Sequence, residues 1–187
     1  ADSMQVYDRL RVLTARPSPA DEARFTHRLY GHVPAEARYS VGAWLPDVAP
    51  VLGEAQAAGA LPILVGGTGL YFKALTEGLA AIPDVPAEIR AAWRERIERE
   101  GAPRLHALLE ERDPVSAAPI RPGDAQRITR ALAVLETTGQ TLSAWKSARR
   151  IPPLLGIGET ARFVVEPDRA ALYRRIDARF DNMIAKG

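Results

Sequence analysis

The chain has 187 residues, of which 47% are hydrophobic and 26% are charged, the proportions of an ordinary globular protein. Its 25 Lys and Arg residues outnumber its 23 Asp and Glu residues by only two, which excludes a uniformly basic coat for nucleic acid. The absence of cysteine excludes disulfides and thiolate chemistry. The sequence has neither an apolar run as long as a membrane span nor a signal-peptide pattern, so we expect a cytoplasmic protein without membrane contact.

Arginine supplies nearly all of the positive charge. Lys73, Lys146 and Lys186 are the only lysines, which leaves 25 − 3 = 22 arginines. The planar guanidinium suits phosphate, so the bias permits phosphate recognition. A GC-rich genome would produce the same bias.

The first part of the chain predicts loops followed by a helix. Residues 1–39 are mostly polar, with a Pro-rich turn at residues 16–19, and we expect loop with short helical pieces. Ser40 is a candidate N-cap for a helix that ends at Gly59. Pro46 and Pro50 lie inside this helix and should break or kink it.

The next segment has the pattern of a strand, a turn and a helix. Residues 61–65 form a continuous apolar run that ends at Gly66, as in a central parallel strand. The Gly66-Gly67-Thr68-Gly69 turn then leads into a helix over residues 70–75. This order predicts an α/β sheet with crossover connections.

A helical segment follows from residue 83 to residue 150. Apolar stripes and end signals predict four helices. The first has the stripe Ile89, Trp93 and Ile97 and ends at Gly101, and the second has the stripe Leu105, Leu108 and Leu109 and ends at Asp113-Pro114. The third extends from the Asp124 cap to Gly139, and the short fourth extends from Thr141 to Arg149. The α/β pattern returns with a strand over residues 162–166 and a helix that Asp168 caps. We therefore predict an α/β core (1–82 and 151–187) that is interrupted by an all-helical insertion (83–150).

The glycine-rich turn is the most suggestive local feature. Glycines at the carboxyl end of a strand let the backbone approach a ligand, and the next helix N-terminus favours an anion. Thr68 would add a hydroxyl donor in the same crevice. A turn that only needs unusual backbone angles is an equally good interpretation. The chain contains no G-x-x-x-x-G-K-[ST] phosphate loop.

Two arginine-bearing helices are candidates for binding anions. Residues 121–150 hold six basic and two acidic residues (Arg121, Arg127, Arg130, Lys146, Arg149 and Arg150 against Asp124 and Glu136). This face would contact a phosphate backbone or simply lie in solvent. On the last helix, Arg175 and Arg179 share a face and would either clamp an anion or be solvated.

Other residue types give weaker signals. Asp2 offers a carboxylate that could act as a general base, although such an isolated residue is more often solvated. His27, His32 and His106 lack the spacing of metal ligands, and we single out no metal-binding residue. The tryptophans, Trp44, Trp93 and Trp145, lie on apolar stripes, so we expect them in the core.

Four motifs together resemble a known family, and the resemblance spans nearly the whole chain. In order, they are ADSMQVY (1–7), TARP (14–17), LPILVGGTGLYFKAL (61–75) and DAQRITRAL (124–132). They are similar to those of the tRNA dimethylallyltransferase (tRNA isopentenyltransferase) family. The second and third motifs are specific in combination.

The resemblance implies a P-loop NTPase-like parallel-sheet core with a helical insertion. It also implies transfer of a dimethylallyl group from its diphosphate to N6 of the adenine next to the tRNA anticodon, assisted by Mg²⁺. Asp2 would be the general base, Thr68 would hold the bridging oxygen of the diphosphate, and Arg175, Gly66 and Gly67 would contact the diphosphate. The residues implied to contact the anticodon stem-loop are Asp2, Ser3, Met4, Gln5, Arg90, Gln126, Arg127, Ile128, Thr129 and Arg130. We expect a monomer.

The same resemblance implies that the chain is a fragment. It begins at Ala1 without methionine, and the phosphate loop of the family would precede this residue, so we expect a full-length parent to be active and this chain to be inactive. Two alternatives remain open. One is an adenylate isopentenyltransferase that acts on free nucleotide, and the other is a non-catalytic RNA-binding module or a degraded P-loop kinase relative.

Overall fold

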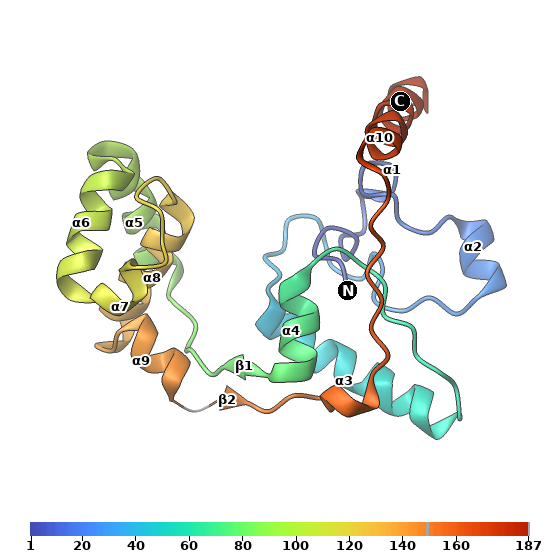
Figure 1. Cartoon of the computed structure of the whole chain (residues 1–187), viewed down its shortest axis with the longest axis horizontal. Helices are drawn as coiled ribbons and strands as arrows, with labels where there is room; N and C mark the ends of the chain where they lie inside the picture. The colour runs from blue at the N-terminus through green and yellow to red at the C-terminus, as the bar shows by residue number, and fades with distance from the viewer. Residues whose placement is uncertain (149, 187) are drawn as a thin grey trace. The chain divides into compact units, whose positions relative to one another are not determined.

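The computed structural model describes residues 1–148 and 150–186. The chain divides into two compact units, each of which is described by itself (Figure 1). The split unit consists of Ala1–Glu77 and Pro153–Gly187, and the helical unit consists of Gly78–Pro152. The predicted boundaries of the insertion were residues 83 and 150.

The helical unit contains the helices that the apolar stripes predict. Its helices are α5 (Ala87–Glu100), α6 (Ala102–Arg112), α7 (Pro114–Ala117), α8 (Ala125–Thr138) and α9 (Leu142–Ser147). Asp124 Oδ1 accepts the backbone N–H of Arg127 at 3.1 Å at the start of α8, and Gly139 ends this helix with a φ of +68°. Both end signals are therefore confirmed. Arg149, the predicted last residue of the fourth helix, lies outside the described residues.

The core of the helical unit joins the stripes of α5, α6 and α8. Leu105, Leu109, Ile128 and Leu132 have at most 1% of their surface exposed, and they belong to one continuous cluster. Trp93 lies in the same cluster and donates its indole N–H to Glu136 Oε2 at 2.6 Å, so the polar end of this buried side chain is satisfied.

A buried carboxylate connects α7 to α9. Asp113 is 2% exposed, and its Oδ1 accepts the backbone N–H of Ser116 at 3.1 Å and the hydroxyl of Ser143 at 2.7 Å. Burial opposes ionisation of Asp113, but the hydrogen bonds outweigh it and lower the pKa of this carboxyl. Asp113 therefore begins α7 and also fixes the first turn of α9.

A two-stranded antiparallel ribbon lies where the chain enters and leaves the helical unit. Strand β1 (Leu79–Ala80) pairs with β2 (Arg150–Ile151), with Leu79 opposite Ile151. The ribbon joins segments that are about seventy residues apart in the sequence, and no local pattern predicted it.

The split unit contains the remaining helices: α1 (Arg11–Thr14), α2 (Pro19–Arg24), α3 (Val41–Ala57), α4 (Gly69–Glu77), the 3₁₀ helix η1 (Ile157–Glu159) and α10 (Arg169–Lys186). Ser40 caps α3 as predicted. Of the break or kink predicted for α3, the break is wrong, because the helix continues through Pro46 and Pro50. Trp44 is 1% exposed and stacks on Tyr71 of α4 with ring centroids 4.4 Å apart. Burial of this face of α3 offsets the hydrogen bonds that the prolines cannot donate.

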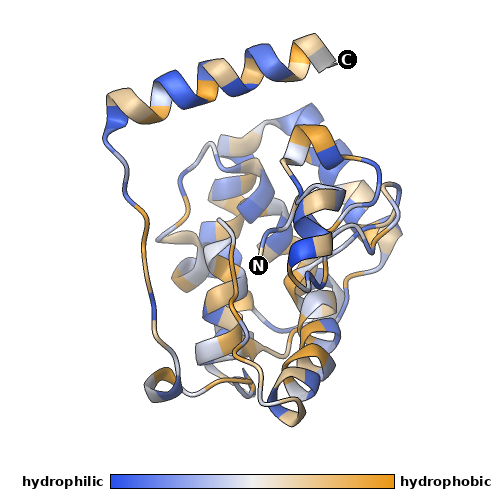
Figure 2. Cartoon of the chain, turned by 90° about the vertical axis from the view of Figure 1, so that its right-hand side faces the viewer, coloured by the Kyte–Doolittle hydropathy of each residue, from blue (hydrophilic) through white to orange (hydrophobic). Residues whose placement is uncertain are grey.

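The two predicted parallel strands do not form in the described residues. Residues 61–65 and 162–166 are outside any strand, and Leu64 is half-buried. Six other large apolar side chains of these segments are between 60% and 89% exposed: Leu61, Ile63, Val65, Phe163, Val164 and Val165. Figure 2 shows residues 163–165 as an extended apolar segment before α10. A strand needs a hydrogen-bonded neighbour, and an apolar run alone does not supply one. Among the described residues the architecture is therefore α/β but mostly helical, with one small sheet and an isolated parallel bridge between Tyr7 and Val33.

Helix α10 is amphipathic. Asp168 Oδ1 accepts the N–H of Ala171 at 2.9 Å, which confirms the predicted cap. The predicted stripe of Leu172, Ile176, Phe180 and Ile184 is 39% to 69% exposed. None of the helices that the structure describes combines the length and the apolar character needed to cross a membrane.

Candidate active site

Two segments about 65 residues apart in the sequence meet in the split unit. The backbone N–H of Ser3 donates to Thr68 Oγ1 at 2.9 Å, and the Thr68 hydroxyl donates to Ser3 Oγ at 3.2 Å. The backbone N–H of Thr68 donates to the carbonyl oxygen of Ala1 at 3.4 Å. The structure therefore places the predicted Asp2 and Thr68 in neighbouring positions.

Gly66 permits this meeting because it has no side chain. A Cβ atom at Gly66 would lie 2.2 Å from the carbonyl oxygen of Ala1 and 2.9 Å from the backbone nitrogen of Asp2. At Gly67, by contrast, the nearest atom to a Cβ would be Asp2 Oδ2, at 4.0 Å. The two glycines thus differ: Gly66 is required for close approach of the backbones, whereas Gly67 has room for a methyl group.

The two oxygens of Asp2 have different environments. Oδ1 accepts the backbone N–H groups of Met4 at 2.9 Å and Gln5 at 3.3 Å, which forms a local turn. Oδ2 lies toward Gly67 and accepts no hydrogen bond from the described part of the chain. One oxygen therefore holds the carboxylate in place, and the other can accept a proton.

Two tyrosines lie near Asp2. Burial, followed by the negative charge of Asp2, raises the pKa of Tyr30. Burial, followed by Tyr7 and Asp2, raises the pKa of Tyr71. Both phenols therefore stay protonated around the carboxylate. Tyr71 belongs to the same motif as Thr68, whereas the position of Tyr30 gave no signal in the sequence that could have joined it to Asp2.

The other residues of the first motif are used in different ways. Gln5 donates from Nε2 to the carbonyl oxygens of Thr14 and Ala15, at 3.0 and 2.9 Å. These two bonds occupy both of its amide hydrogens, which ties the motif to the end of α1. Met4 is 51% exposed, so it is the residue of this motif most open to a ligand.

Arg175, the predicted diphosphate ligand, lies on the exposed surface of α10. No hydrogen bond or ion pair joins it to another residue within the described ranges. Its neighbour one turn later, Arg179, donates to the carbonyl oxygen of Leu13 at 2.7 Å and so connects α10 to α1. The structure does not bring Arg175 into contact with Asp2 or Thr68.

The predicted RNA-contacting residues of the helical unit divide into exposed and buried side chains. Gln126, Arg127 and Arg130 are exposed on α8. Ile128 is fully buried in the core, so this structure does not offer its side chain to RNA. Thr129 donates its hydroxyl to the carbonyl oxygen of Ala125 at 2.8 Å. The signal that could have separated them is the helical period, because Ile128 belongs to the apolar stripe.

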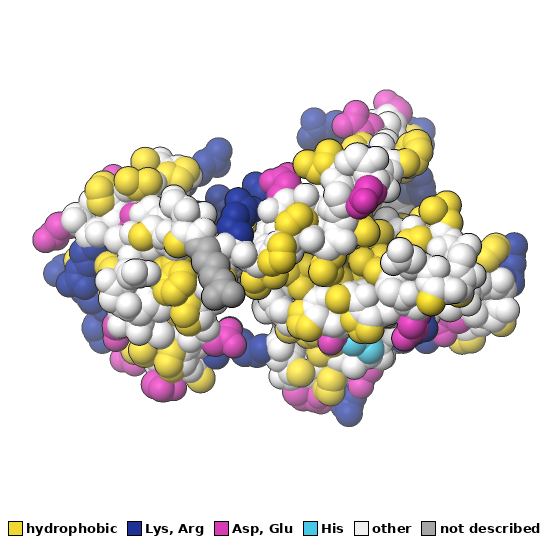
Figure 3. Space-filling model, turned by 90° about the horizontal axis from the view of Figure 1, so that it is seen from below, with side chains coloured by type: hydrophobic (Ala, Val, Ile, Leu, Met, Phe, Trp, Pro, Cys, Tyr) yellow, Lys and Arg dark blue, Asp and Glu magenta, His cyan; other side chains and the backbone are white. Residues whose placement is uncertain are grey.

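The arginines of this face are partly engaged within the unit. Arg127 forms an ion pair with Asp124 at 3.4 Å, and Arg90 donates to the carbonyl oxygen of Val85. Partial burial lowers the pKa of Arg130, while Asp84 raises it and Arg90 lowers it further. An arginine nevertheless stays charged. On the side shown in Figure 3, the helical unit carries both basic and acidic side chains rather than one uniform charge.

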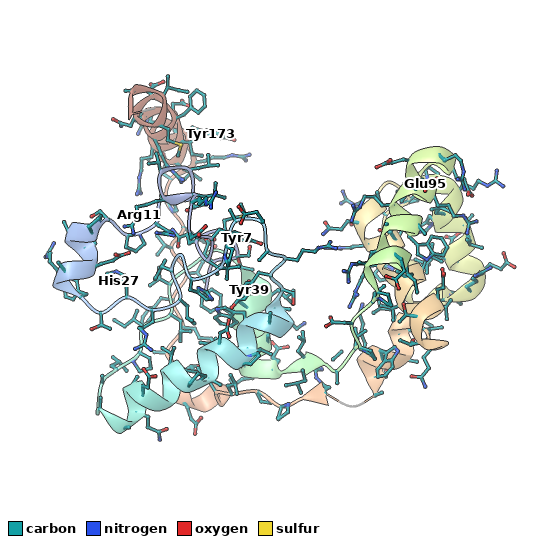
Figure 4. The ribbon with its side chains drawn as sticks, turned by 180° about the vertical axis from the view of Figure 1, so that it is seen from behind. Tyr7, Arg11, His27, Tyr39, Glu95 and Tyr173 are labelled. Atoms are coloured by element: carbon teal, nitrogen blue, oxygen red, sulfur yellow. The ribbon has the colours of Figure 1, made fainter. Side chains whose placement is uncertain are left out.

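Sequence reasoning missed a polar cluster at the start of α3. Tyr39 donates its hydroxyl to Asp47 Oδ2 at 2.5 Å, and His32 Nε2 lies 3.1 Å from the same hydroxyl. Burial, followed by the hydrogen bond to Asp47, raises the pKa of Tyr39 strongly. Tyr39 lies beside α3 in Figure 4. The separation of eight residues between Tyr39 and Asp47 is not diagnostic, because it spans a loop and a helix start.

The donors of the described residues do not fit a magnesium ion held by protein groups alone. Within residues 1–148 and 150–186, no group of three or more His, Cys, Asp or Glu side chains could hold a metal. Mg²⁺ commonly takes one or two carboxylates together with phosphate oxygens of a substrate.

The family model described as IPP transferase matches residues 5–187 of the chain. The chain belongs to this family. The resemblance inferred from the four motifs is thereby confirmed.

Individual relatives agree with this assignment. A protein of Nitrobacter hamburgensis named tRNA dimethylallyltransferase is 53% identical over 186 residues, and the match covers 100% of this chain and 58% of the relative. The crystal structure of the tRNA isopentenylpyrophosphate transferase of Bacillus halodurans is similar with a TM-score of 0.51 and 27% identity, covering 100% of this chain and 56% of that one. A eukaryotic dimethylallyltransferase structure reaches a TM-score of 0.70 at 22% identity, over 100% of this chain and 46% of its own, which shows similarity of fold. The chain thus spans less than two thirds of the length of each.

Proposed function

We propose that this chain forms part of a tRNA-modifying prenyltransferase. The proposed reaction transfers a dimethylallyl group from its diphosphate to N6 of the adenine next to the anticodon. The observation that carries the proposal is the meeting of Asp2 and Thr68: the Ser3 N–H, directly after Asp2, bonds Thr68 Oγ1 at 2.9 Å. Membership of the IPP transferase family over residues 5–187 supports it.

The chemistry needs a base and a charge-stabilising donor on opposite sides of one reacting carbon. The adenine N6 forms a bond to the allylic carbon, the bond from that carbon to the diphosphate oxygen breaks, and N6 loses one proton. Asp2 Oδ2 accepts this proton in the proposed role. The Thr68 hydroxyl donates to the diphosphate, which leaves as an anion whose charge develops in the transition state.

The exposed side chains of α8 supply an RNA surface in the same proposal. Arg127 and Arg130 are charged and exposed on one helix with Gln126, and arginine contacts to phosphates dominate affinity for nucleic acid. An anticodon loop can present an unstacked base to a site in this way. Arg175 contacts the diphosphate if α10 and the site close around it.

The finer features of the enzyme rest on the family resemblance. They are a P-loop NTPase-like core, assistance by Mg²⁺ on the diphosphate, a cytoplasmic location and a monomeric state. Mg²⁺, when bound to the diphosphate, would neutralise part of its charge.

The test uses a full-length chimera, in which residues 1–187 replace the matching segment of the Nitrobacter hamburgensis relative. Asp2→Asn keeps an Oδ1 acceptor for the N–H groups of Met4 and Gln5 but removes the base. We expect kcat for prenyl transfer to an anticodon stem-loop to fall about 10²- to 10⁴-fold, with the dissociation constant for RNA changed less than about twofold.

The matched control is Asp8→Asn, because Asp8 is an exposed carboxylate of the same segment and should leave kcat unchanged. Prenylation of AMP but not of the stem-loop by the chimera would show that the substrate is a free nucleotide rather than tRNA. A chimera that binds the stem-loop without any transfer would refute the enzymatic proposal.

A further inference from the structure

The hydrogen bonds of Thr68 leave its hydroxyl without a proton for a ligand. A threonine hydroxyl has one hydrogen to donate and two lone pairs. One lone pair accepts the Ser3 N–H at 2.9 Å, and the hydrogen points to Ser3 Oγ at 3.2 Å. A phosphate oxygen that binds Thr68 as an acceptor must therefore replace Ser3 Oγ.

The two bonds from Ser3 differ in what they allow. The backbone N–H belongs to the turn that Asp2 Oδ1 stabilises through Met4 and Gln5, so it is a fixed anchor for Thr68 Oγ1. The serine hydroxyl is on a single rotatable bond, and its contact is the longer of the two. Release of this hydroxyl leaves Thr68 Oγ1 in place, with its hydrogen available and polarised by the N–H bond.

We propose that Ser3 is a positioning residue for Thr68: its N–H fixes the threonine oxygen, and its hydroxyl holds the threonine proton until a diphosphate oxygen displaces it. The inference rests on the proposed function, and it assigns the Ser3 side chain to the diphosphate rather than to RNA. Binding of diphosphate then requires the exchange of one hydrogen bond.

This exchange has a measurable cost. A neutral hydrogen bond contributes roughly 1 kcal/mol, which corresponds to about a fivefold change in affinity. Removal of the Ser3 hydroxyl takes this bond away from the ligand-free state only. The Ser3→Ala variant should therefore bind diphosphate about fivefold more tightly, whereas loss of a merely structural serine would weaken binding.

The experiment measures binding of inorganic diphosphate to the full-length chimera by isothermal titration calorimetry, so it does not depend on turnover. Ser3→Ala should lower the dissociation constant about fivefold, while Ser3→Thr, which keeps the hydroxyl, should match the unmodified chimera within about twofold. In a Thr68→Val background, Ser3→Ala should have no effect, because no proton remains to be held. The matched control is Ser147→Ala, since Ser147 is exposed on α9.

Several results would overturn the inference. Ser3→Ala could bind diphosphate no more tightly than the unmodified chimera, or it could raise the affinity for diphosphate equally in the Thr68→Val background. Ser3→Thr could have the same affinity for diphosphate as Ser3→Ala, or the unmodified chimera could fail to bind diphosphate. A weaker affinity of Ser3→Ala for the stem-loop, with diphosphate unaffected, would assign the hydroxyl to RNA instead. Failure of prenyl transfer with the predicted diphosphate affinities would refute the proposed function and leave the role of Ser3 intact.

Discussion

Replacement of Gly66 by alanine should displace the segment that carries Asp2. The new Cβ would lie 2.2 Å from the carbonyl oxygen of Ala1, whereas real Cβ atoms essentially never approach closer than 3.0 Å. Neither atom of this contact can move by a side-chain rotation, because the Cβ is bonded directly to the backbone of residue 66 and the oxygen belongs to the backbone of Ala1. Residues 1–3 must therefore move by about 1 Å relative to Thr68.

A displacement of this size has a large kinetic effect if Asp2 and Thr68 act on one substrate. Misplacement of a catalytic group by about 1 Å costs roughly 10²-fold in rate. We therefore expect kcat of the Gly66→Ala chimera to fall about 100-fold in a prenyl-transfer assay that uses a stem-loop RNA. The thermal unfolding midpoint should change much less, because the contact lies at the edge of the unit rather than in a core.

Gly69→Ala is the matched control, because a Cβ there would meet no other atom within 4 Å and because Gly69 is not among the residues implied to contact the diphosphate. This variant should keep kcat within about threefold. Equal activities of the two alanine variants would show that the approach of Ala1 to Gly66 does not set the geometry of the reaction. A large loss for Gly69→Ala and none for Gly66→Ala would contradict the assignment of the close backbone approach to Gly66.

Two further predictions concern the helical unit. The pKa of Asp113 is lowered in the folded state, so the unfolded chain binds more protons than the folded chain. The ionised carboxylate therefore stabilises the folded state at pH values above the ordinary pKa near 3.8. This stabilisation is lost as the pH falls through the folded pKa. Asp113→Asn should therefore lower the free energy of unfolding by about 1–3 kcal/mol at pH 7. Urea titrations should show that the difference between variant and unmodified protein shrinks below about pH 4. A difference that is independent of pH would contradict the role of the charge. Arg127→Ala should reduce the slope of log Kd against log salt for a stem-loop RNA by about 0.7 to 0.9, whereas Arg99→Ala, on α5, should not; equal slopes for both would place the RNA surface elsewhere.

The helices of this protein follow from local signals. Ser40, Asp124 and Asp168 were predicted as caps from residue type and position, and each accepts the expected backbone N–H. A cap and an apolar stripe act within a few residues, so no distant partner is needed to read them. Proline is the exception: Pro46 and Pro50 should have interrupted α3, but burial of the Trp44 face maintains the helix.

The strands and the fine structure of the site depend on distant partners. Residues 61–65 are apolar enough for a central strand, yet they are mostly exposed and are not paired with another strand in the described chain. Family motifs placed Asp2 and Thr68 in one site, and the structure adds how they meet. It also places Ile128 in the core, although it lies between two exposed arginines in the sequence.

The amino-acid sequence by itself determined the helices, their caps and the family, because these depend on neighbouring residues and on motif order. Only the tertiary structure decided which side chains share the Thr68 proton, which oxygen of Asp2 can accept a proton and which glycine the site requires. The Thr68 and Gly66 contacts join atoms that are about 65 residues apart in the chain, and the choice between the two oxygens of Asp2 depends on the folded turn that holds Met4 and Gln5. These contacts depend on atomic positions to within a few tenths of an ångström, which residue types and their spacing in the sequence do not encode.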